Sequence, residues 1–163
     1  MAAPLRTVRA LATVGAREKH CQCANQAFSH EPSPARARHW YQCVTTSPGY
    51  RPEQLRGAFR DGEQVGSYMI EERTMQVGTA RLLTGCIGAV VTYPGHRYQG
   101  VATALMHDTL AYARSHRYAL LLLDGIPKFY YRYGYDDVFD VAVQDIDRAA
   151  VLAHPPVRYA SAR

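Results

Sequence analysis

A short glycine-containing turn at residues 97–102 carries the groups in this chain best suited to bind an anion. An apolar run ends just before it at Pro94, and a helical pattern of apolar residues starts at Val101. A strand that leads into a helix through such a turn directs several backbone N–H groups, and the positive end of the helix dipole, at one point. Gly100 lets a ligand approach the backbone closely, and Arg97 can add charge-assisted hydrogen bonds. The pattern therefore predicts a phosphate-binding turn.

A tyrosine-rich segment follows the next apolar run, and residues 129–135 read Phe-Tyr-Tyr-Arg-Tyr-Gly-Tyr. A phenol with an ordinary pKa of about 10 can serve as a general acid, and such assistance is worth about 10²–10⁴-fold in rate. Aromatic side chains of short helices also often only pack against a sheet. Composition alone leaves both roles open for each tyrosine.

The bulk composition bounds the kind of protein that carries these segments. The chain has 163 residues, 47% of them hydrophobic and 20% charged, which suits one globular domain with one core. The apolar runs are far shorter than the ~20 residues of a membrane span. The first residues lack the continuous apolar segment of a secretory signal. We therefore expect a cytoplasmic protein without membrane partners; a transit peptide is the alternative, because the first 17 residues include arginine and no acid.

The distribution of charged residues and cysteines narrows the function further. The net charge is +5, but the arginines are scattered rather than clustered, so we expect no nucleic-acid partner. His20, Cys21 and Cys23 lie close together, yet the C-x-C spacing is not that of a structural zinc site and no second pair follows. The four cysteines therefore predict reduced thiols and no metal site.

The elements that would position the turn and the tyrosines can be outlined from periodicity and turn signals. Residues 5–30 are predicted to be helical, most clearly 11–28, with a short edge strand at 4–10 as the alternative. Ser33 is an acceptable N-cap for a second helix. Asp61-Gly62 predicts a hairpin between strands at 54–60 and 64–72, and a second break is expected near Gly78.

The second half alternates strands and helices. Residues 79–92 are expected to cover one strand, a bulge or bend at Gly85 or Gly88, and a central strand. A helix at 99–116, a buried strand at 118–123, a short helix at 128–133 closed by Gly134, and a final strand at 138–143 follow. This order predicts an α+β (mixed α/β) domain built around one sheet.

Together, the two segments resemble a known family. The turn, preceded by V-x-x-P-x-H-R and followed by T-A-L-M, resembles motif A of the GNAT superfamily of N-acetyltransferases, and residues 125–138 (GIPKFYYRYGYDDV) resemble its C-terminal motif. The stretches SPGYRPEQLR and CIGAV are similar to the N-terminal domain of enhanced-intracellular-survival-type acetyltransferases. The resemblance implies a GNAT-like acyl-CoA N-acyltransferase fold, with a mostly antiparallel central sheet flanked by helices. We expect one such domain at residues 1–150, and at 151–163 a tail or the start of an absent C-terminal domain.

The resemblance also implies a site for acetyl-CoA as co-substrate. The turn would hold the pyrophosphate, a bulged central strand would offer backbone groups to the pantetheine arm, and Tyr130 would be the catalytic residue that protonates the leaving thiolate. The cofactor-binding residues carried over by the motifs are Val90, Val91, Thr92, Arg97, Tyr98, Gln99, Gly100, Val101, Ala102, Thr103, Gly125 and Ile126.

The acceptor side is less defined by the sequence. The implied reaction is acetyl transfer to a primary amine, of a small molecule or a peptide, by direct attack in a ternary complex; the alternative is a non-catalytic acyl-CoA-binding or assembly domain. Glu71, Glu72 and Asp124 are the candidates for the general base, whereas His96 lies in the turn and is expected to help bind the anion. Self-association into a homo-oligomer stays open.

Three departures from the family pattern stand out. The expected N-terminal strand is weak, Ala102 replaces the commoner glycine, and Tyr98 and Gln99 stand where Gly or Arg is frequent. The last of these predicts a lower positive charge at the turn.

Overall fold

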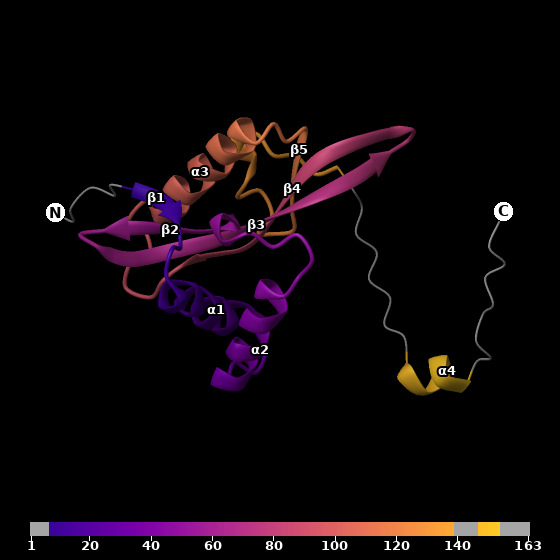
Figure 1. The fold of residues 1–163 in the computed structure, drawn as a ribbon, viewed down its shortest axis with the longest axis horizontal. Coiled ribbons are helices and arrows are strands. Elements are labelled where there is room, and N and C mark those ends of the chain that lie inside the picture. Colours follow the sequence, from indigo (N-terminus) through magenta and orange to yellow (C-terminus); the bar gives the residue numbers. More distant parts are fainter. Residues whose placement is uncertain (1–6, 139–146, 154–163) are drawn as a thin grey trace.

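The computed structural model describes residues 7–138 and 147–153, and its centre is a five-stranded sheet in the order β1-β2-β3-β4-β5. All neighbouring strands are antiparallel except β4 and β5, which are parallel. Helices α1 and α2 cover one face of the sheet, and α3 covers the other (Figure 1). The elements, in chain order, are β1 Thr7–Ala10, α1 Val14–Phe28, α2 Pro34–Thr45, the 3₁₀ helix η1 Pro52–Gln54, β2 Leu55–Arg60, β3 Glu63–Val77, β4 Ala80–Thr92, α3 Val101–Ser115, β5 Leu120–Leu123, the 3₁₀ helix η2 Tyr131–Tyr133 and α4 Arg148–Ala153.

The first two helices begin at side-chain caps. The Thr13 hydroxyl accepts a hydrogen bond from the Ala16 amide at 3.2 Å, and α1 therefore begins after Thr13 rather than at residue 11. Ser33 caps α2 as expected, with Pro34 in the first turn. Residues 7–10 are not helical: they form β1, which pairs with β2, so the edge-strand alternative is the correct one.

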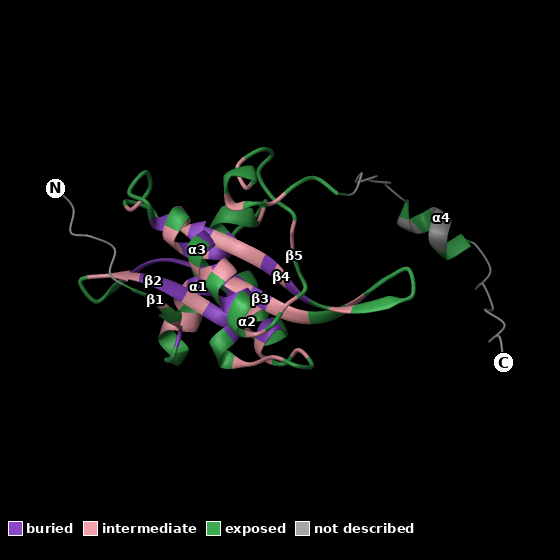
Figure 2. Cartoon of the chain, turned by 90° about the horizontal axis from the view of Figure 1, so that it is seen from above, coloured by how far each residue is buried: buried purple, intermediate pink, exposed green. Residues whose placement is uncertain are grey.

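The β2–β3 hairpin turns at Asp61-Gly62, as predicted. Asp61 has φ 49° and Gly62 has φ 83°, and two positive values are what a tight two-residue hairpin turn requires. Strands β3 and β4 then pair along almost their whole length, to Val77 and Ala80 at the second turn. Their tip extends beyond the helices as a solvent-exposed arm (Figures 1 and 2).

Strand β4 is continuous, and the expected break within 79–92 is a bulge. Ser67 and Met69 on β3 pair with Val91 and Gly88, so β4 carries one extra residue in this interval. Ala89 takes φ 50°, in the left-handed region. The bulge therefore begins one residue after Gly88, and Gly85 does not interrupt the strand.

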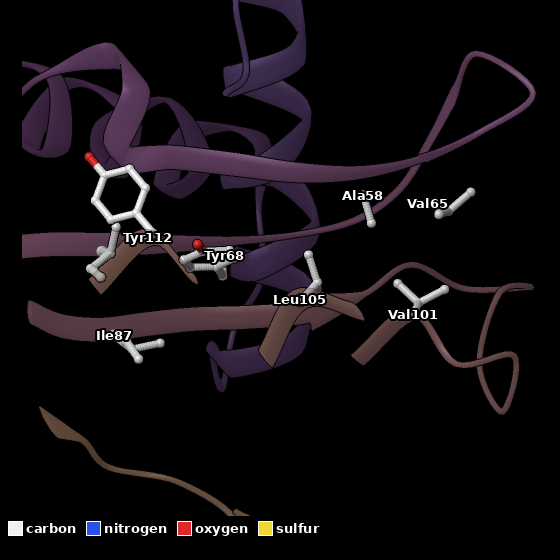
Figure 3. Close-up of a cluster of buried hydrophobic side chains, with 8 residues drawn as sticks. Ala58, Val65, Tyr68, Ile87, Val101, Leu105 and Tyr112 are labelled. Carbon is white, nitrogen blue, oxygen red and sulfur yellow. The ribbon is translucent and has the colours of Figure 1, made fainter. Parts of the chain in front are cut away.

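The main core lies between the sheet and α3 (Figure 3). Val101 and Leu105 of α3 are buried against Ala58, Tyr68 and other residues of β2, β3 and β4. The opposite face packs against α1 and α2 through two smaller apolar clusters. Together these cores fix the relative positions of β4 and α3, the two elements that flank the predicted turn.

A polar contact also anchors α3 to the sheet. The Asp108 carboxylate of α3 accepts from the Arg56 guanidinium at 3.0 Å and from the Tyr68 hydroxyl at 2.7 Å, in a largely buried setting. Burial and the nearby carboxylate both raise the pKa of Tyr68. The predicted final strand at 138–143 lies, apart from Val138, outside the described residues.

Candidate active site

The turn before α3 leaves the start of that helix open to a ligand. Gly100 is the N-cap with φ 77°, and no side chain caps the helix, in contrast to α1 and α2. The first helical hydrogen bond runs from the Ala104 amide to the Gly100 carbonyl, at 3.0 Å. The amides of Val101, Ala102 and Thr103 therefore have no partner within the helix and can bind an anion.

The side chains of the predicted turn residues contribute unequally. Val101 is buried in the core, so only its backbone can face a ligand, whereas Arg97 and Thr103 are exposed. Tyr98 is fully exposed and has φ 59°. The Gln99 amide donates to the Gly95 carbonyl at 2.9 Å and closes the turn.

A cation from another strand lies beside this turn. Arg60, at the end of β2, donates to the side-chain oxygen of Gln99 and, at 3.3 Å, to its carbonyl. His96 faces Glu63 across 3.6 Å. The lower positive charge expected from Tyr98 and Gln99 is thus offset by a guanidinium that lies 39 residues away in sequence. No local sequence signal points to Arg60, because the tertiary fold alone brings it to the turn.

The pairing between β4 and β5 stops beside the bulge. The pairing of these strands ends at Ile87 and Leu123, so residues 88–92 of β4 have no partner on the β5 side within the described chain. Val91 is buried against Ala24 and Tyr93, and Val90 packs toward the α3 core, which leaves only backbone groups for a ligand. Val90, Val91 and Thr92 therefore stand where an extended acyl chain could pair with free N–H and C=O groups.

A buried polar network supports the bulge from the α1 side. His20 Nδ1 lies 2.8 Å from the Ser67 hydroxyl, which lies 2.9 Å from the Tyr93 hydroxyl, and the Gln64 amide donates to Tyr93. Ser67 is the residue that pairs with Val91. Burial lowers the pKa of His20 to about 4 and raises that of Tyr93. The imidazole is therefore neutral at physiological pH and acts as part of the support for β4.

Tyr130 is half-buried beyond the end of β5. Its ring lies against the backbone of Gly125, where an added Cβ would come within 2.4 Å of Tyr130 Cε2 and 3.1 Å of the hydroxyl oxygen. Phe129 and Tyr135 contact the ring edge to face, with centroids 4.9 and 6.0 Å away. Burial raises the pKa of Tyr130, so its phenol stays protonated at neutral pH. Only glycine at 125 permits this position of the ring.

The other tyrosines of the segment have different surroundings. The Tyr133 hydroxyl donates to Thr103 Oγ1 at 3.1 Å and ties the segment to the first turn of α3. Tyr131 is exposed and donates to Asp137, and Tyr135 packs against the α3 core. The structure thus brings the segment that carries Tyr130 to the same end of α3 as the anion-binding turn.

An acetyltransferase (GNAT) domain model matches residues 10–138 of the chain. The chain belongs to the GNAT acetyltransferase family. Similar solved structures include Eis1 from Mycobacterium abscessus, with 20% identity and a TM-score of 0.63 over 80% of this chain. An acetyltransferase from Trypanosoma brucei has 19% identity and a TM-score of 0.63 over 86% of this chain and 99% of its own. The aminoglycoside N-acetyltransferase AAC(6')-Iy in complex with CoA has 13% identity and a TM-score of 0.62, over 90% of this chain and 98% of its own.

The three identities are low enough that these likenesses establish the fold and nothing finer. This chain spans 31% of the length of Eis1. No curated protein sequence matches it significantly. As a GNAT acetyltransferase it has the mixed α+β fold expected from the sequence, and β1 supplies the N-terminal strand that the sequence signalled only weakly.

On the β3 strand of this acetyltransferase, two of the general-base candidates face opposite ways. Glu72 lies two residues after Ile70 and therefore on the same face of the strand, and Ile70 packs in the α3 core. The Glu72 carboxylate accepts from Arg51 at 3.0 and 3.4 Å. That hydrogen bond is the main cause of the lowered pKa of Glu72. Glu71 lies two residues after Met69, which packs on the α1 and α2 side, so Glu71 points to that face. Asp124, just after β5, is exposed.

The remaining candidates are placed as follows. Gly125 and Ile126 are exposed at the end of β5. All four cysteines are free: Cys21 is buried, Cys43 is exposed, and Cys23 and Cys86 are half-buried.

Within the described ranges, no group of three or more His, Cys, Asp or Glu side chains could hold a metal ion. The helices that can be described include none with the length and apolar character needed to cross a bilayer.

Proposed function

We propose that this acetyltransferase moves the acetyl group of acetyl-CoA to a primary amine, by direct attack within a ternary complex. The observation that carries the proposal is the coincidence of three features at one end of α3. These are the uncapped helix start, the unpaired edge of β4 at residues 88–92, and the Tyr130 segment tied to α3 through Tyr133 and Thr103. A structural neighbour in complex with CoA supports the choice of donor.

The donor would be held mainly by backbone groups. The amides at 101–103 and the Arg97 guanidinium suit a pyrophosphate, since both donate to anionic oxygens. Residues 90–92 would offer their free edge to the pantetheine amides, and Gly125 and Ile126, which follow β5, would contact the other side of that arm. A β4 amide directed at the thioester oxygen would stabilise the negative charge that develops there.

Tyr130 is proposed as the general acid. The amine nitrogen forms a bond to the acyl carbon, the carbon–sulfur bond breaks, and the sulfur takes the phenolic proton. The new amide nitrogen then returns a proton to the phenolate, so Tyr130 ends the cycle unchanged. The raised pKa of Tyr130 keeps this proton available at neutral pH.

The proposal is tested by calorimetric titration with acetyl-CoA, followed by a screen of primary amines for thiol release. We expect Tyr130→Phe to bind acetyl-CoA like wild type but to lower kcat by about 10²-fold or more. Tyr131→Phe, which removes an exposed hydroxyl that donates to Asp137, is the matched control and should retain activity. No binding of acetyl-CoA at high micromolar concentration would refute the donor, and equal turnover in both variants would remove Tyr130 from the mechanism. Binding without turnover of any amine would favour a non-catalytic acyl-CoA-binding domain.

A further inference from the structure

The segment that carries Tyr130 lies on the surface of the domain and has few attachments to it. Most side chains of residues 124–138 are exposed. The backbone hydrogen bonds described for this segment stay within it, and in one of them the Tyr133 amide donates to the Tyr130 carbonyl at 2.9 Å. The position of Tyr130 relative to α3 therefore depends on a small number of side-chain contacts.

Tyr133 makes the one hydrogen bond that joins this segment to the rest of the described chain. Its hydroxyl donates to Thr103 Oγ1 at 3.1 Å, from a position 30 residues further along the sequence. Its ring meets His107, one turn further along α3, edge to face with centroids 5.9 Å apart. Tyr135 packs against the α3 core, but its hydroxyl has no hydrogen-bond partner among the described residues. Tyr133 is thus the polar link between α3 and Tyr130.

Thr103 belongs to the first turn of α3, whose amides are proposed to hold the pyrophosphate. It is the third residue after the N-cap Gly100, and its side chain is exposed. A threonine hydroxyl can accept and donate at the same time. Because Thr103 Oγ1 accepts from Tyr133, its own proton is available to an anion at the helix start. Hydrogen bonds in such a chain strengthen one another, so an anion there would make Thr103 a better acceptor for Tyr133.

We infer that Tyr133 is a positioning residue that couples binding of the donor to the placement of Tyr130, through the hydroxyl of Thr103. The inference rests on the proposed function. With an anion at residues 101–103, the contact from Tyr133 tightens, and Tyr133 holds the Tyr130 carbonyl through its own amide. The coupling is reciprocal, so the contact raises the affinity for the anion by the same factor. The general acid is then held most firmly when the donor is bound.

The first test measures amide hydrogen exchange at positions 133 and 134, whose amides donate to Tyr130 and Tyr131 at 2.9 Å. The probe is CoA itself, so the test does not require turnover. We expect saturating CoA to slow exchange at both positions about fivefold in wild type, the usual net value of one hydrogen bond. In Tyr133→Phe, which removes the hydroxyl and keeps the ring, the change should be less than about 1.5-fold. Tyr131→Phe, in the same short helix, is the matched control and should respond like wild type.

The second test separates the coupling from a fixed structural tie by changing the donor. Acetyl-CoA carries the pyrophosphate, whereas S-acetylpantetheine has no phosphate. Tyr133→Phe should lower kcat about fivefold with acetyl-CoA but less than about 1.5-fold with S-acetylpantetheine. With acetyl-CoA, Thr103→Val should make Tyr133→Phe without further effect, because the two changes remove the same hydrogen bond. Thr103→Ser keeps the hydroxyl and should keep the effect of Tyr133→Phe.

The possible results separate this inference from the proposed function. Equal losses with both donors would mean that Tyr133 only ties the segment in place, and would overturn the coupling. Exchange at positions 133 and 134 that does not respond to CoA, or that responds equally in Tyr133→Phe and wild type, would also overturn it but leave the proposed function standing. A wild-type chain that binds no acetyl-CoA would instead refute the proposed function, and this inference with it.

Discussion

Mild acid should destabilise the protein through His20, the buried histidine beneath the β4 bulge. The side chain is 1% exposed, and burial lowers its pKa from 6.5 to about 4. The unfolded chain therefore takes up a proton at a higher pH than the folded chain. The stabilisation from the neutral imidazole is complete above pH 6.5 and is lost as the pH falls toward 4.

The size of the effect follows from that difference in pKa. A difference of about 2.5 units at about 1.4 kcal/mol per unit gives a total of about 3 kcal/mol. Between pH 6.5 and 5, the loss should reach about 2 kcal/mol, before most carboxylates begin to titrate.

The free energy of unfolding can be measured by urea titration between pH 7.5 and 5.0. The only tryptophan, Trp40, lies with its ring 6.4 Å from the His20 ring, so its fluorescence should report the loss of this region. We expect His20→Gln to be less stable than wild type at pH 7.5 but to lose about 1 kcal/mol less per pH unit below 6.5. His30→Gln, at an exposed histidine, should keep the wild-type slope. Parallel slopes for wild type and His20→Gln would refute the reasoning.

Three further substitutions probe the turn, the anchor of α3 and the position of the acid. Arg60→Met removes the cation beside the turn and should raise the Kd for CoA about tenfold in calorimetry. Arg114→Met, at the far end of α3, is the control, and an equal effect of this change would contradict a local role of Arg60. Asp108→Ala leaves a largely buried guanidinium without its carboxylate and should cost about 3–5 kcal/mol in urea unfolding; a loss below about 1 kcal/mol would refute this. Gly125→Ala places a methyl group 2.4 Å from the Tyr130 ring and should lower kcat at least about tenfold, and an unchanged kcat would mean that the ring does not act from its observed position.

The parts of the fold that the sequence predicted well have strong local signals. The Asp61-Gly62 turn and the Ser33 cap depend on a few adjacent residues, and both are present. The helix expected at 99–116 is α3, shorter by two residues at its start and one at its end.

The misjudged parts depend on contacts between distant segments. Residues 7–10 are a strand because β2 offers an edge to pair with, which no local pattern shows. Gly85 looked like a break in β4, but an added Cβ there would come within 2.8 Å of Tyr118 and Leu121 side-chain atoms. This glycine therefore permits close packing inside a continuous strand.

The same division applies to the candidate site. Motif spacing identified the turn and the Tyr130 segment, and the structure brings both to the start of α3. The sequence alone could not separate Glu71 from Glu72. Met69 and Ile70 before them are both apolar, so the alternation along β3 does not show which of the two faces each carboxylate takes. Only the cores on the two faces of the sheet distinguish them.

The missing cap of α3 makes the stability of its first turn depend on what binds there. In α1 and α2, the hydroxyls of Thr13 and Ser33 accept hydrogen bonds from amides of the first turn and stabilise it. In α3 that partner would come from outside the chain, so amide hydrogen exchange at residues 101–103 becomes a measure of site occupancy. A saturating anion adds RT ln(1 + [L]/Kd) to the free energy of opening, about 2.7 kcal/mol at one hundred times Kd. The local unfolding equilibrium of this helix start would then depend on the ligand concentration.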